Sequence, residues 1–470
     1  MKRKFLTILA LGTGLLAMAQ GENPEVIAKF NCHNMSANGE WMIGRSKTWQ
    51  DPDDGSFNPE SSLCNVKTGE IFGYADLFTL TPVSRNISSK GIAIVSTDAV
   101  IFTGPDMYEV HEMPYILVPG EEPIELNELY DHSPSNTKEC YAAAIADDAS
   151  AFLGYFEAYP QQYPFLCTIN EDLTIGEPEF FPLPQKDIFG QTPYAVELTC
   201  ISDDCNTVAG LVACKNATVV YPIIYTRGEN GEWTYNCPTA HLYDSADPSS
   251  FPSFYYAPSQ AQVALSPDGT KFAATQALPG DVDNFDTYKI WVFDLENDTY
   301  SVIESENPDL VATGILNDGT VIGTFFGTVV ISYIKTPSMQ DFIDFAEYII
   351  KLDPTAQEWI DKNLMVKAYD VTPSGDMVEV ILPYTGQVFV SNDLSVIGAG
   401  RSLGEGFSYV FSNMPALGDT SAPVLEKNPE GVFNVYNLTG VKVLTTSEPS
   451  QLNKLVKGIY IVNGKKFIIK

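Results

Sequence analysis

The chain has 470 residues, with 60 acidic and 27 basic side chains that give a formal net charge of −33 at pH 7. This acidity excludes a typical nucleic-acid-binding protein, because phosphate neutralisation requires clustered Lys and Arg side chains. Intrinsic disorder is also excluded, because 44% of the residues are hydrophobic and 12% are aromatic, which is enough to build a large core.

The N-terminal residues have the pattern of an export signal. Residues 2–4 are basic, residues 5–18 are apolar, and Ala17-Met18-Ala19 is a small-x-small cleavage site. We therefore predict a signal peptide over residues 1–19. The apolar run is shorter than the roughly 20 residues that span a bilayer, and no other stretch is long enough. The mature chain is expected to have no transmembrane segment.

Residues 20–416 repeat a short phrase. The phrase has five positions: an apolar residue first, Ser or a similar residue second, any residue third, Asp, Asn or Lys fourth, and a small residue fifth. An apolar strand that often ends in Gly follows it. Seven copies start at Met35, Ile87, Ile145, Ile201, Leu265, Ile315 and Val371. They are 52, 58, 56, 64, 50 and 56 residues apart, and this period is typical of β-propeller blades.

The repeated unit resembles the blades of the TolB-like and WD40-like families, and Ser266-Pro-Asp-Gly-Thr270 resembles them most. The resemblance implies an all-β fold, a β-propeller of about seven four-stranded blades. An eighth match at Val390 follows the seventh by only 19 residues, so six to eight blades remain open. Tandem β-sandwiches are the alternative fold. Apolar residues at helical spacing predict a short helical insert near residues 338–364.

Two aromatic clusters on Pro-rich segments could form a ligand site. Exposed aromatic rings offer flat apolar faces with polar rims, on which sugar rings can stack. The clusters consist of Tyr155, Tyr159 and Tyr163, and of Phe254, Tyr255 and Tyr256. Packing between blades is the competing interpretation of both clusters.

Two acidic clusters could bind calcium, which prefers carboxylate and carbonyl oxygens. They consist of Asp51, Asp53 and Asp54, and of Asp281, Asp283 and Asp286. Neither cluster has the spacing of an EF-hand loop, and ordinary solvated turns would contain the same residues. Calcium is the only cofactor that the sequence suggests.

The eight cysteines are an even number in a chain that is predicted to be exported, which favours disulfides. Cys32 and Cys140 share strand parity before two copies of the phrase, and Cys64 and Cys167 lie in similar contexts further along. We therefore predict the pairs Cys32–Cys64 and Cys140–Cys167. The other four cysteines allow three pairings, which stay open: Cys200, Cys205, Cys214 and Cys237.

Residues 417–470 form a linker and a separate C-terminal module. From Gly431 onward there are six Lys and one acid, a net charge of +5 on an acidic chain. Turn residues between β-branched and aromatic flanks predict a pair of hairpins. The module resembles the C-terminal sorting tail of type IX secretion substrates in Bacteroidota, which implies export by that machinery. The residues that carry the resemblance are Gly440, Gly458, Tyr460, Gly464, Lys465 and Lys466. The last strands of the main domain are the alternative.

These features predict a secreted or cell-surface β-propeller that binds an extracellular protein or glycan. The alternative is a carbohydrate-active hydrolase or lyase with carboxylates in the propeller funnel. The sequence has no H-E-x-x-H motif and no Walker loop. A pair of catalytic carboxylates stays open, because the separation that defines such a pair cannot be measured from sequence. A binding function is favoured over an enzyme.

Overall fold

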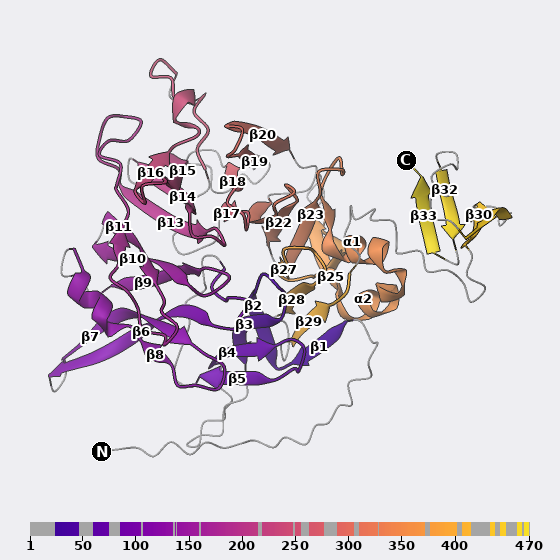
Figure 1. Cartoon of the computed structure of the whole chain (residues 1–470), viewed down its shortest axis with the longest axis horizontal. Helices are drawn as coiled ribbons and strands as arrows, with labels where there is room; N and C mark the ends of the chain where they lie inside the picture. The colour runs from indigo at the N-terminus through magenta and orange to yellow at the C-terminus, as the bar shows by residue number, and fades with distance from the viewer. Residues whose placement is uncertain are drawn as a thin grey trace.

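A computed structural model of the chain describes residues 24–46, 60–74, 85–104, 107–134, 137, 139–158, 161–214, 219–247, 250–254, 263–276, 289–304, 310–327, 329–371, 377–401, 407–414, 433–437, 442–447, 458–462 and 465–469. Antiparallel sheets in this part of the chain follow one another in a ring (Figure 1). The fold is a seven-bladed β-propeller, as the repeat predicts. Tandem β-sandwiches are wrong, because sandwiches stack sheets in pairs rather than around one axis.

The first three blades run outward from an inner strand in chain order. Blade 1 consists of β2 (Phe30–Met35), β3 (Trp41–Ser46), β4 (Glu60–Asn65) and β5 (Ile71–Tyr74). Blade 2 has three described strands, β6 (Ala93–Gly104), β7 (Met107–Leu117) and β8 (Ile124–Glu125), followed by the 3₁₀ helix η1 (Asn127–His132). Blade 3 consists of β9 (Cys140–Ile145), β10 (Ala151–Ala158), β11 (Gln161–Thr168) and β12 (Glu179–Phe180).

The next three blades repeat this order. Blade 4 consists of β13 (Ala195–Ile201), β14 (Thr207–Cys214), β15 (Val219–Arg227) and β16 (Trp233–Asn236), followed by η2 (Ala240–Leu242). Blade 5 consists of β17 (Val263–Leu265), β18 (Lys271–Gln276), β19 (Lys289–Asp294) and β20 (Thr299–Glu304). Blade 6 consists of β21 (Val311–Ile315), β22 (Val321–Phe326), β23 (Val330–Lys335) and β24 (Ile343–Asp344).

Blade 7 closes the ring with strands from both ends of the propeller. Its inner strands are β27 (Val388–Val390), β28 (Ile397–Arg401) and β29 (Phe407–Phe411). Its outer strand is β1 (Glu25–Ala28), which pairs antiparallel with β29 so that Ile27 lies opposite Ser408. The segment that opens the propeller therefore completes its last blade.

A segment between blades 6 and 7 interrupts the repeat. It contains α1 (Phe345–Leu352), η5 (Pro354–Ala356) and α2 (Gln357–Asn363), which lie within the range of the predicted helical insert. The Asp344 carboxylate caps α1 by accepting a hydrogen bond from the Glu347 N–H at 2.8 Å. Buried Tyr348 and Ile360 pack the helices against blades 6 and 7, so the insert is part of the core.

A hairpin outside the ring follows the helices. It pairs β25 (Met365–Val371) with β26 (Met377–Pro383) in a two-stranded sheet of its own. Val371, where the seventh copy of the phrase starts, therefore ends a strand of this hairpin and not of a blade, which corrects the sequence assignment. The match at Val390, which was the eighth, follows β27 and is the seventh blade's copy. The insert lengthens the chain between these blades, which is why the regular spacing pointed to the wrong copy.

Each blade turns from its inner strand to its second strand through the phrase. The fifth residue has a positive φ in all seven turns, and its N–H donates to the carbonyl three residues earlier. These residues are Gly39, Gly91, Ala149, Cys205, Gly269, Gly319 and Leu394. The Asp of the phrase accepts hydrogen bonds from its own turn; Asp268 Oδ1, for example, accepts from the Thr270 N–H at 3.0 Å. The acid at the fourth position of the phrase is therefore a structural turn residue.

The glycine after the phrase has a steric reason. In blade 4 the inner strand β13 has a bulge between Leu198 and Cys200, and Gly210 of β14 lies opposite Leu198. A Cβ on Gly210 would overlap the Glu197 carbonyl oxygen and lie 2.7 Å from the Leu198 Cα. Gly44 of β3 meets the Asn31 carbonyl in the same way next to the bulge of β2. In blades 1 and 4, Gly thus stands where the bulged inner strand approaches its neighbour.

The C-terminal residues form a separate antiparallel sheet. Its strands are β30 (Phe433–Asn437), β31 (Lys442–Thr446), β32 (Gly458–Val462) and β33 (Lys465–Ile469), in the order β31-β30-β32-β33. Two hairpins, β30–β31 and β32–β33, are joined by pairing of β30 with β32. No strand of the ring belongs to this sheet within the described residues. Across the same residues, no helix has the length and apolar character that a membrane crossing requires.

Candidate functional site

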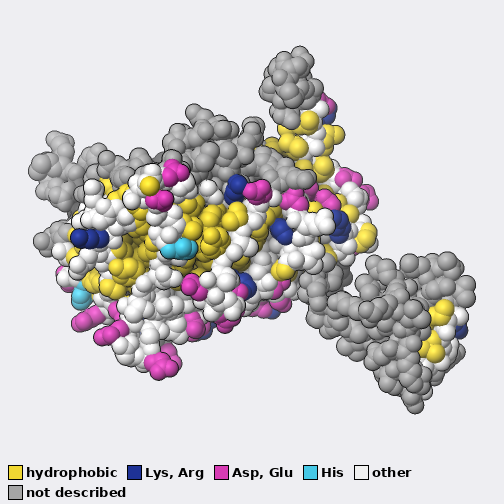
Figure 2. All heavy atoms as spheres, turned by 90° about the horizontal axis from the view of Figure 1, so that it is seen from above, with side chains coloured by type: hydrophobic (Ala, Val, Ile, Leu, Met, Phe, Trp, Pro, Cys, Tyr) yellow, Lys and Arg dark blue, Asp and Glu magenta, His cyan; other side chains and the backbone are white. Residues whose placement is uncertain are grey.

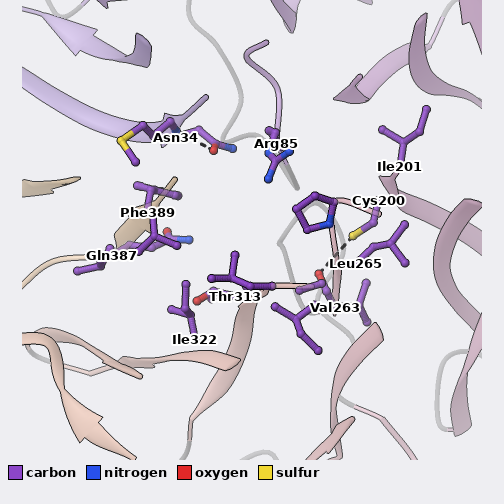
Figure 3. Close-up of a pocket in the computed structure, with 18 of the residues that line it drawn as sticks. Asn34, Arg85, Cys200, Ile201, Val263, Leu265, Thr313, Ile322, Gln387 and Phe389 are labelled. Atoms are coloured by element: carbon purple, nitrogen blue, oxygen red, sulfur yellow. Dashed lines mark hydrogen bonds between the residues drawn. The ribbon is translucent and has the colours of Figure 1, made fainter. Parts of the chain in front are cut away.

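The central channel of the propeller contains a cavity of about 110 Å³ between the inner strands (Figure 3). Most of its lining residues are apolar, with side chains from β17, β21 and β27 such as Leu265, Ile315 and Phe389. The described lining residues include no Asp or Glu; the polar ones are His33, Asn34, Arg85, Thr313 and Gln387. His33 and Thr313 are the extra residues of the bulges in β2 and β21, which brings both side chains to the channel.

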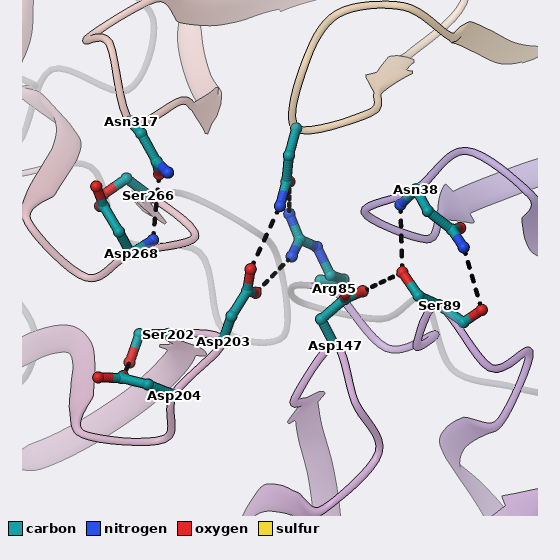
Figure 4. A network of polar contacts seen from close by, with 11 residues as sticks. Asn38, Arg85, Ser89, Asp147, Ser202, Asp203, Asp204, Ser266, Asp268 and Asn317 are labelled. Carbon is teal, nitrogen blue, oxygen red and sulfur yellow. Dashed lines mark hydrogen bonds and ion pairs between the residues drawn. The ribbon is translucent and has the colours of Figure 1, made fainter.

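Arg85 spans the channel at the level of the phrase turns (Figure 4). It precedes β6, and its guanidinium donates from Nη1 to Asp203 Oδ1 of blade 4 and from Nη2 to Asn392 Oδ1 of blade 7, each at 3.1 Å. Asn392 Nδ2 also donates to Asp203 Oδ2 at 3.3 Å. Burial raises the pKa of Asp203 although Arg85 beside it acts in the opposite direction, and Asp147 adds to the rise. Three distant parts of the chain are therefore tied together across the ring.

His33 is a titratable side chain that lines the channel cavity and has a strongly shifted pKa. Burial, and then the positive charge of Arg45, lowers the pKa of His33 to about 4. Asn31 Nδ2 lies 3.3 Å from its Nε2, and its Nδ1 is buried with no hydrogen-bond partner in the described part of the chain. The imidazole is therefore neutral at pH 7.

His33 should make the propeller less stable in mild acid. Between its folded pKa of about 4 and its unfolded pKa near 6.5, the unfolded chain binds a proton that the folded chain does not, so stability falls as the pH falls through this range. The free energy of unfolding should therefore fall between pH 7 and pH 4, and this fall should be about 2 kcal/mol smaller in His33→Asn than in the unchanged chain. Urea denaturation at the two pH values measures it. His132→Asn, at an exposed histidine, is the control. An unchanged pH dependence in His33→Asn would contradict the prediction.

A second and larger cavity is a groove on the outer side of the ring, between blades 4 and 5. It has a volume of about 820 Å³. The lining residues come from the end of β15, the segment from β16 to η2, and the β19–β20 hairpin: Ile224, Thr226, Asn236, Cys237, Pro238, Ala240, His241, Phe293, Asp294, Leu295, Asp298, Thr299 and Tyr300. Figure 2, seen from above Figure 1, shows hydrophobic side chains gathered on this side of the molecule, where these blades lie.

Tyr300 is the exposed aromatic side chain of this blade 4–5 groove. Its ring is stacked on Trp291 of β19, with centroids 4.8 Å apart and planes at 29°, and it lies 6.0 Å from the Phe293 ring. Trp291 is 8% exposed and its Nε1 donates to Gln276 Oε1 at 2.7 Å, whereas Tyr300 is 43% exposed. A fixed aromatic support therefore holds one face of an accessible ring.

The predicted aromatic ligand residues do not form a common exposed site. Tyr155 is buried and stacks on Tyr141 with centroids 4.9 Å apart. Phe254 is also buried, and it packs edge to face on Trp291 at 5.7 Å, behind the groove. Tyr163 is partly buried on β11 of blade 3 and does not line the groove. Tyr159, Tyr255 and Tyr256 lie outside the described residues.

All six acidic residues of the predicted calcium clusters lie outside the described residues: Asp51, Asp53, Asp54, Asp281, Asp283 and Asp286. Over the part of the chain that the structure describes, no three His, Cys, Asp or Glu side chains are grouped so that they could hold a metal ion. Calcium binding therefore stays a prediction. Of the tail residues, Gly458 and Tyr460 lie on β32 and Lys465 and Lys466 on β33, while Gly440 and Gly464 are not described.

The two predicted disulfides are not formed, because all eight cysteines are free thiols. Cys32 and Cys64 share blade 1, but β3 lies between their strands, and β10 separates Cys140 from Cys167 in the same way. Strands two positions apart are roughly 9.6 Å apart, whereas disulfide-bonded Cα atoms are about 4.4–6.8 Å apart. The equivalent strand positions of the cysteines placed each pair in one sheet. They could not show that another strand lies between the two cysteines. Burial raises the pKa of Cys64 and Cys167 to about 12, so both thiols are neutral.

Sequence reasoning missed Tyr300 and Arg85. The signal for the first was the sequence alternation of Tyr300 and Val302 with polar residues in the outer strand of blade 5, where both side chains are exposed. Arg85 had no local signal, because its partners come from blades 4 and 7. The stretch Gly400-Arg-Ser-Leu-Gly404 also matches the G-x-S-x-G pattern of hydrolases. Gly400 and Arg401 end β28, and residues 402–404 lie outside the described residues. The next described element is the strand β29, whereas a nucleophile elbow joins a strand to a helix.

The fold and the two cavities define a seven-bladed β-propeller with a narrow, Arg-spanned channel and a wider groove on its rim. No protein-family model matches the chain, and neither does any curated protein sequence. Solved structures are similar to it at low identity. A hydrazine synthase structure from Kuenenia stuttgartiensis is 12% identical, with 84% of this chain and 99% of that chain covered and a TM-score of 0.44.

Two further solved structures extend the comparison. TolB from Acinetobacter baumannii is 11% identical, with 80% of each chain covered and a TM-score of 0.33. Oligopeptidase B from Leishmania major is 10% identical, with 77% of this chain and 46% of that chain covered and a TM-score of 0.39. These similarities concern the fold alone, and the assignment to the propeller class rests on the order of the sheets.

Proposed function

We propose that this protein is an exported β-propeller that binds an extracellular ligand, a protein or a glycan, in the blade 4–5 groove. The observation that carries the proposal is the difference in size between the two cavities. Ligand pockets usually have volumes of about 300–1,000 Å³. The groove, at about 820 Å³, lies within this range, whereas the central cavity, at about 110 Å³, has room for only a few water-sized molecules.

A groove-filling substitution tests the binding site without assuming the ligand. Thr226 is exposed and lines the groove, so Thr226→Trp should abolish binding of the ligand found by screening the mature chain against glycan arrays and extracellular proteins. Ser301→Trp adds the same bulk to β20 at an exposed residue that does not line the groove, and it should bind normally. Equal binding by both variants would place the ligand elsewhere. Running the screen with calcium and with chelator tests the calcium prediction.

Export is proposed from the sequence of both ends. The signal-peptide pattern implies entry into the periplasm, and the C-terminal module resembles a type IX sorting tail. That the module forms its own sheet, without a ring strand among the described residues, supports its treatment as a separate unit. A secreted or cell-surface location and the type IX machinery as a partner follow from this proposal.

A truncation tests the export route. In a bacterium with a type IX system, removal of residues from Gly431 onward should leave the protein in the periplasm, because the tail is the proposed address. The measurement is the amount of protein in culture medium, cell surface and periplasm fractions. A chain with Lys465→Ala and Lys466→Ala tests whether the secretion machinery recognises the basic end of the tail. Normal secretion of the truncated chain would refute the proposal.

The alternative, a carbohydrate-active enzyme with carboxylates in the funnel, has no specific observation in its favour. Glycoside hydrolysis uses two facing carboxylates about 5–10 Å apart. Asp203 is the acid at the channel that the structure describes in contact with Arg85, and it is held in that ion pair at 3.1 Å. The binding function is therefore favoured.

A further inference from the structure

The chemistry of the blade 4–5 groove points to a class of ligand. We propose that the groove binds a neutral carbohydrate, with one sugar ring stacked on Tyr300 and its hydroxyl groups bound by Asn236, His241 and Asp298. This inference rests on the proposed function and makes it more specific. It also differs from the sequence prediction, since Tyr155, Tyr163 and Phe254, the described residues among the six predicted to bind a ligand, do not line the groove.

Tyr300 provides the apolar platform. A pyranose ring presents a face of C–H groups that packs on an aromatic ring, and the partner ring must be both accessible and fixed. Tyr300 satisfies both conditions, because it is 43% exposed and its other side is stacked on buried Trp291. An aromatic ring that is already held in place loses little conformational entropy when a ligand binds.

The polar rim suits hydroxyl groups. Asn236, His241 and Asp298 line the groove, and none of the three side chains has a hydrogen-bond or ion-pair partner among the residues that the structure describes. An amide offers donors and an acceptor, an imidazole ring offers two nitrogen atoms, and a carboxylate accepts twice or more. Sugar hydroxyls donate and accept, so neighbouring hydroxyls can satisfy all three side chains. An extended peptide would instead present backbone groups at strand spacing.

Charge selects a neutral sugar. The Asp294 carboxylate at the groove is already paired with Lys271 Nζ at 3.1 Å, and Asp298 adds an unneutralised carboxylate. The chain as a whole has a net charge of −33. Uronic acids and sulfated sugars would be repelled by this field, which opposes association of like charges.

The test uses the mature chain and a panel of neutral hexasaccharides, namely β-1,4-glucan, β-1,4-xylan, β-1,4-mannan and α-1,4-glucan. Hexagalacturonate serves as the anionic comparison. We expect at least one neutral oligosaccharide to bind and to change Trp291-dependent fluorescence, and hexagalacturonate to bind at least about tenfold more weakly. Isothermal titration calorimetry gives the dissociation constants.

Variants locate the sugar. Tyr300→Ala should weaken binding about tenfold or more, whereas Tyr300→Phe should change it less than about threefold because the stacking ring is kept. Tyr235→Ala is the matched control: Tyr235 is also 43% exposed, but it points to the opposite face of β16 from Asn236 and does not line the groove. Far-UV circular dichroism and melting curves confirm that each variant is folded.

The outcomes separate this inference from the proposed function. Neutral-sugar binding that is lost in Tyr300→Ala and kept in Tyr235→Ala supports both. No binding by any neutral oligosaccharide overturns the carbohydrate inference, while a protein ligand that Thr226→Trp blocks would still support the proposed function. Sugar binding that Tyr300→Ala and Thr226→Trp leave unchanged overturns the groove as the site.

Discussion

Gly210→Ala is expected to lower the free energy of unfolding by at least about 3 kcal/mol, the upper end of the usual cost of overpacking. The added Cβ would overlap the Glu197 carbonyl oxygen and lie 2.7 Å from the Leu198 Cα, both of them backbone atoms of β13. The backbone cannot move aside by a rotamer change, so β13 and β14 must separate at the bulge. Urea denaturation followed by circular dichroism measures the loss.

Gly323→Ala is the matched control for this steric argument. Gly323 lies at the same place in blade 6, but its Cβ would meet only side-chain atoms, with the Leu310 Cβ at 3.0 Å as the nearest. We expect a change within about 1 kcal/mol, because side chains of the blade can adjust. Equal destabilisation by both substitutions would mean that Gly is kept for backbone conformation and not for the approach of the bulged strand.

Removal of β1 is expected to lower the stability of the propeller by at least about 3 kcal/mol. β1 is the outer strand of blade 7, and Ile27 is its buried side chain, 6% exposed in a cluster with Phe30 and Val410. Loss of a buried Ile typically costs about 2–5 kcal/mol, and the hydrogen bonds of β1 with β29 are lost as well. A chain that starts at Lys29 tests this, with thermal melting and urea denaturation as measurements.

The appropriate control starts at Pro24. That chain lacks the preceding residues but keeps β1, so it should melt like the mature chain. Ile27→Ala in the mature chain should show part of the same loss, about 2 kcal/mol or more. If the chains that start at Lys29 and at Pro24 were equally stable, closure of the ring by β1 would not contribute to stability.

The sequence pattern was sufficient for the propeller because each blade is specified locally. A turn phrase in which an Asx side chain binds its own backbone and the fifth residue has a positive φ can be read from five consecutive residues. The period of these phrases gives the architecture. The assignment of blade 7 went wrong where Phe345 to Asn363 lengthen the chain, because spacing alone cannot distinguish a hairpin at Val371 from a blade turn at Val390.

Side-chain partners could be predicted much less well. Parity placed Cys32 and Cys64 in one sheet, yet β3 separates them, and an aromatic run around Tyr155 pointed to an exposed site although Tyr155 is buried on Tyr141. A period-two pattern gives the face of a strand but not what lies on that face. Whether a ring is exposed depends on the next blade.

The sequence by itself determined the repeating unit, the propeller class, the helical character of the insert and a C-terminal β-module, because these depend on neighbouring residues in the chain. Only the tertiary structure decided the rest. Arg85 meets Asp203 and Asn392 across 118 and 307 residues, and the groove joins the end of β16 to the β19–β20 hairpin. A cavity exists where two blades diverge, and its shape follows from how the ring closes rather than from any single segment.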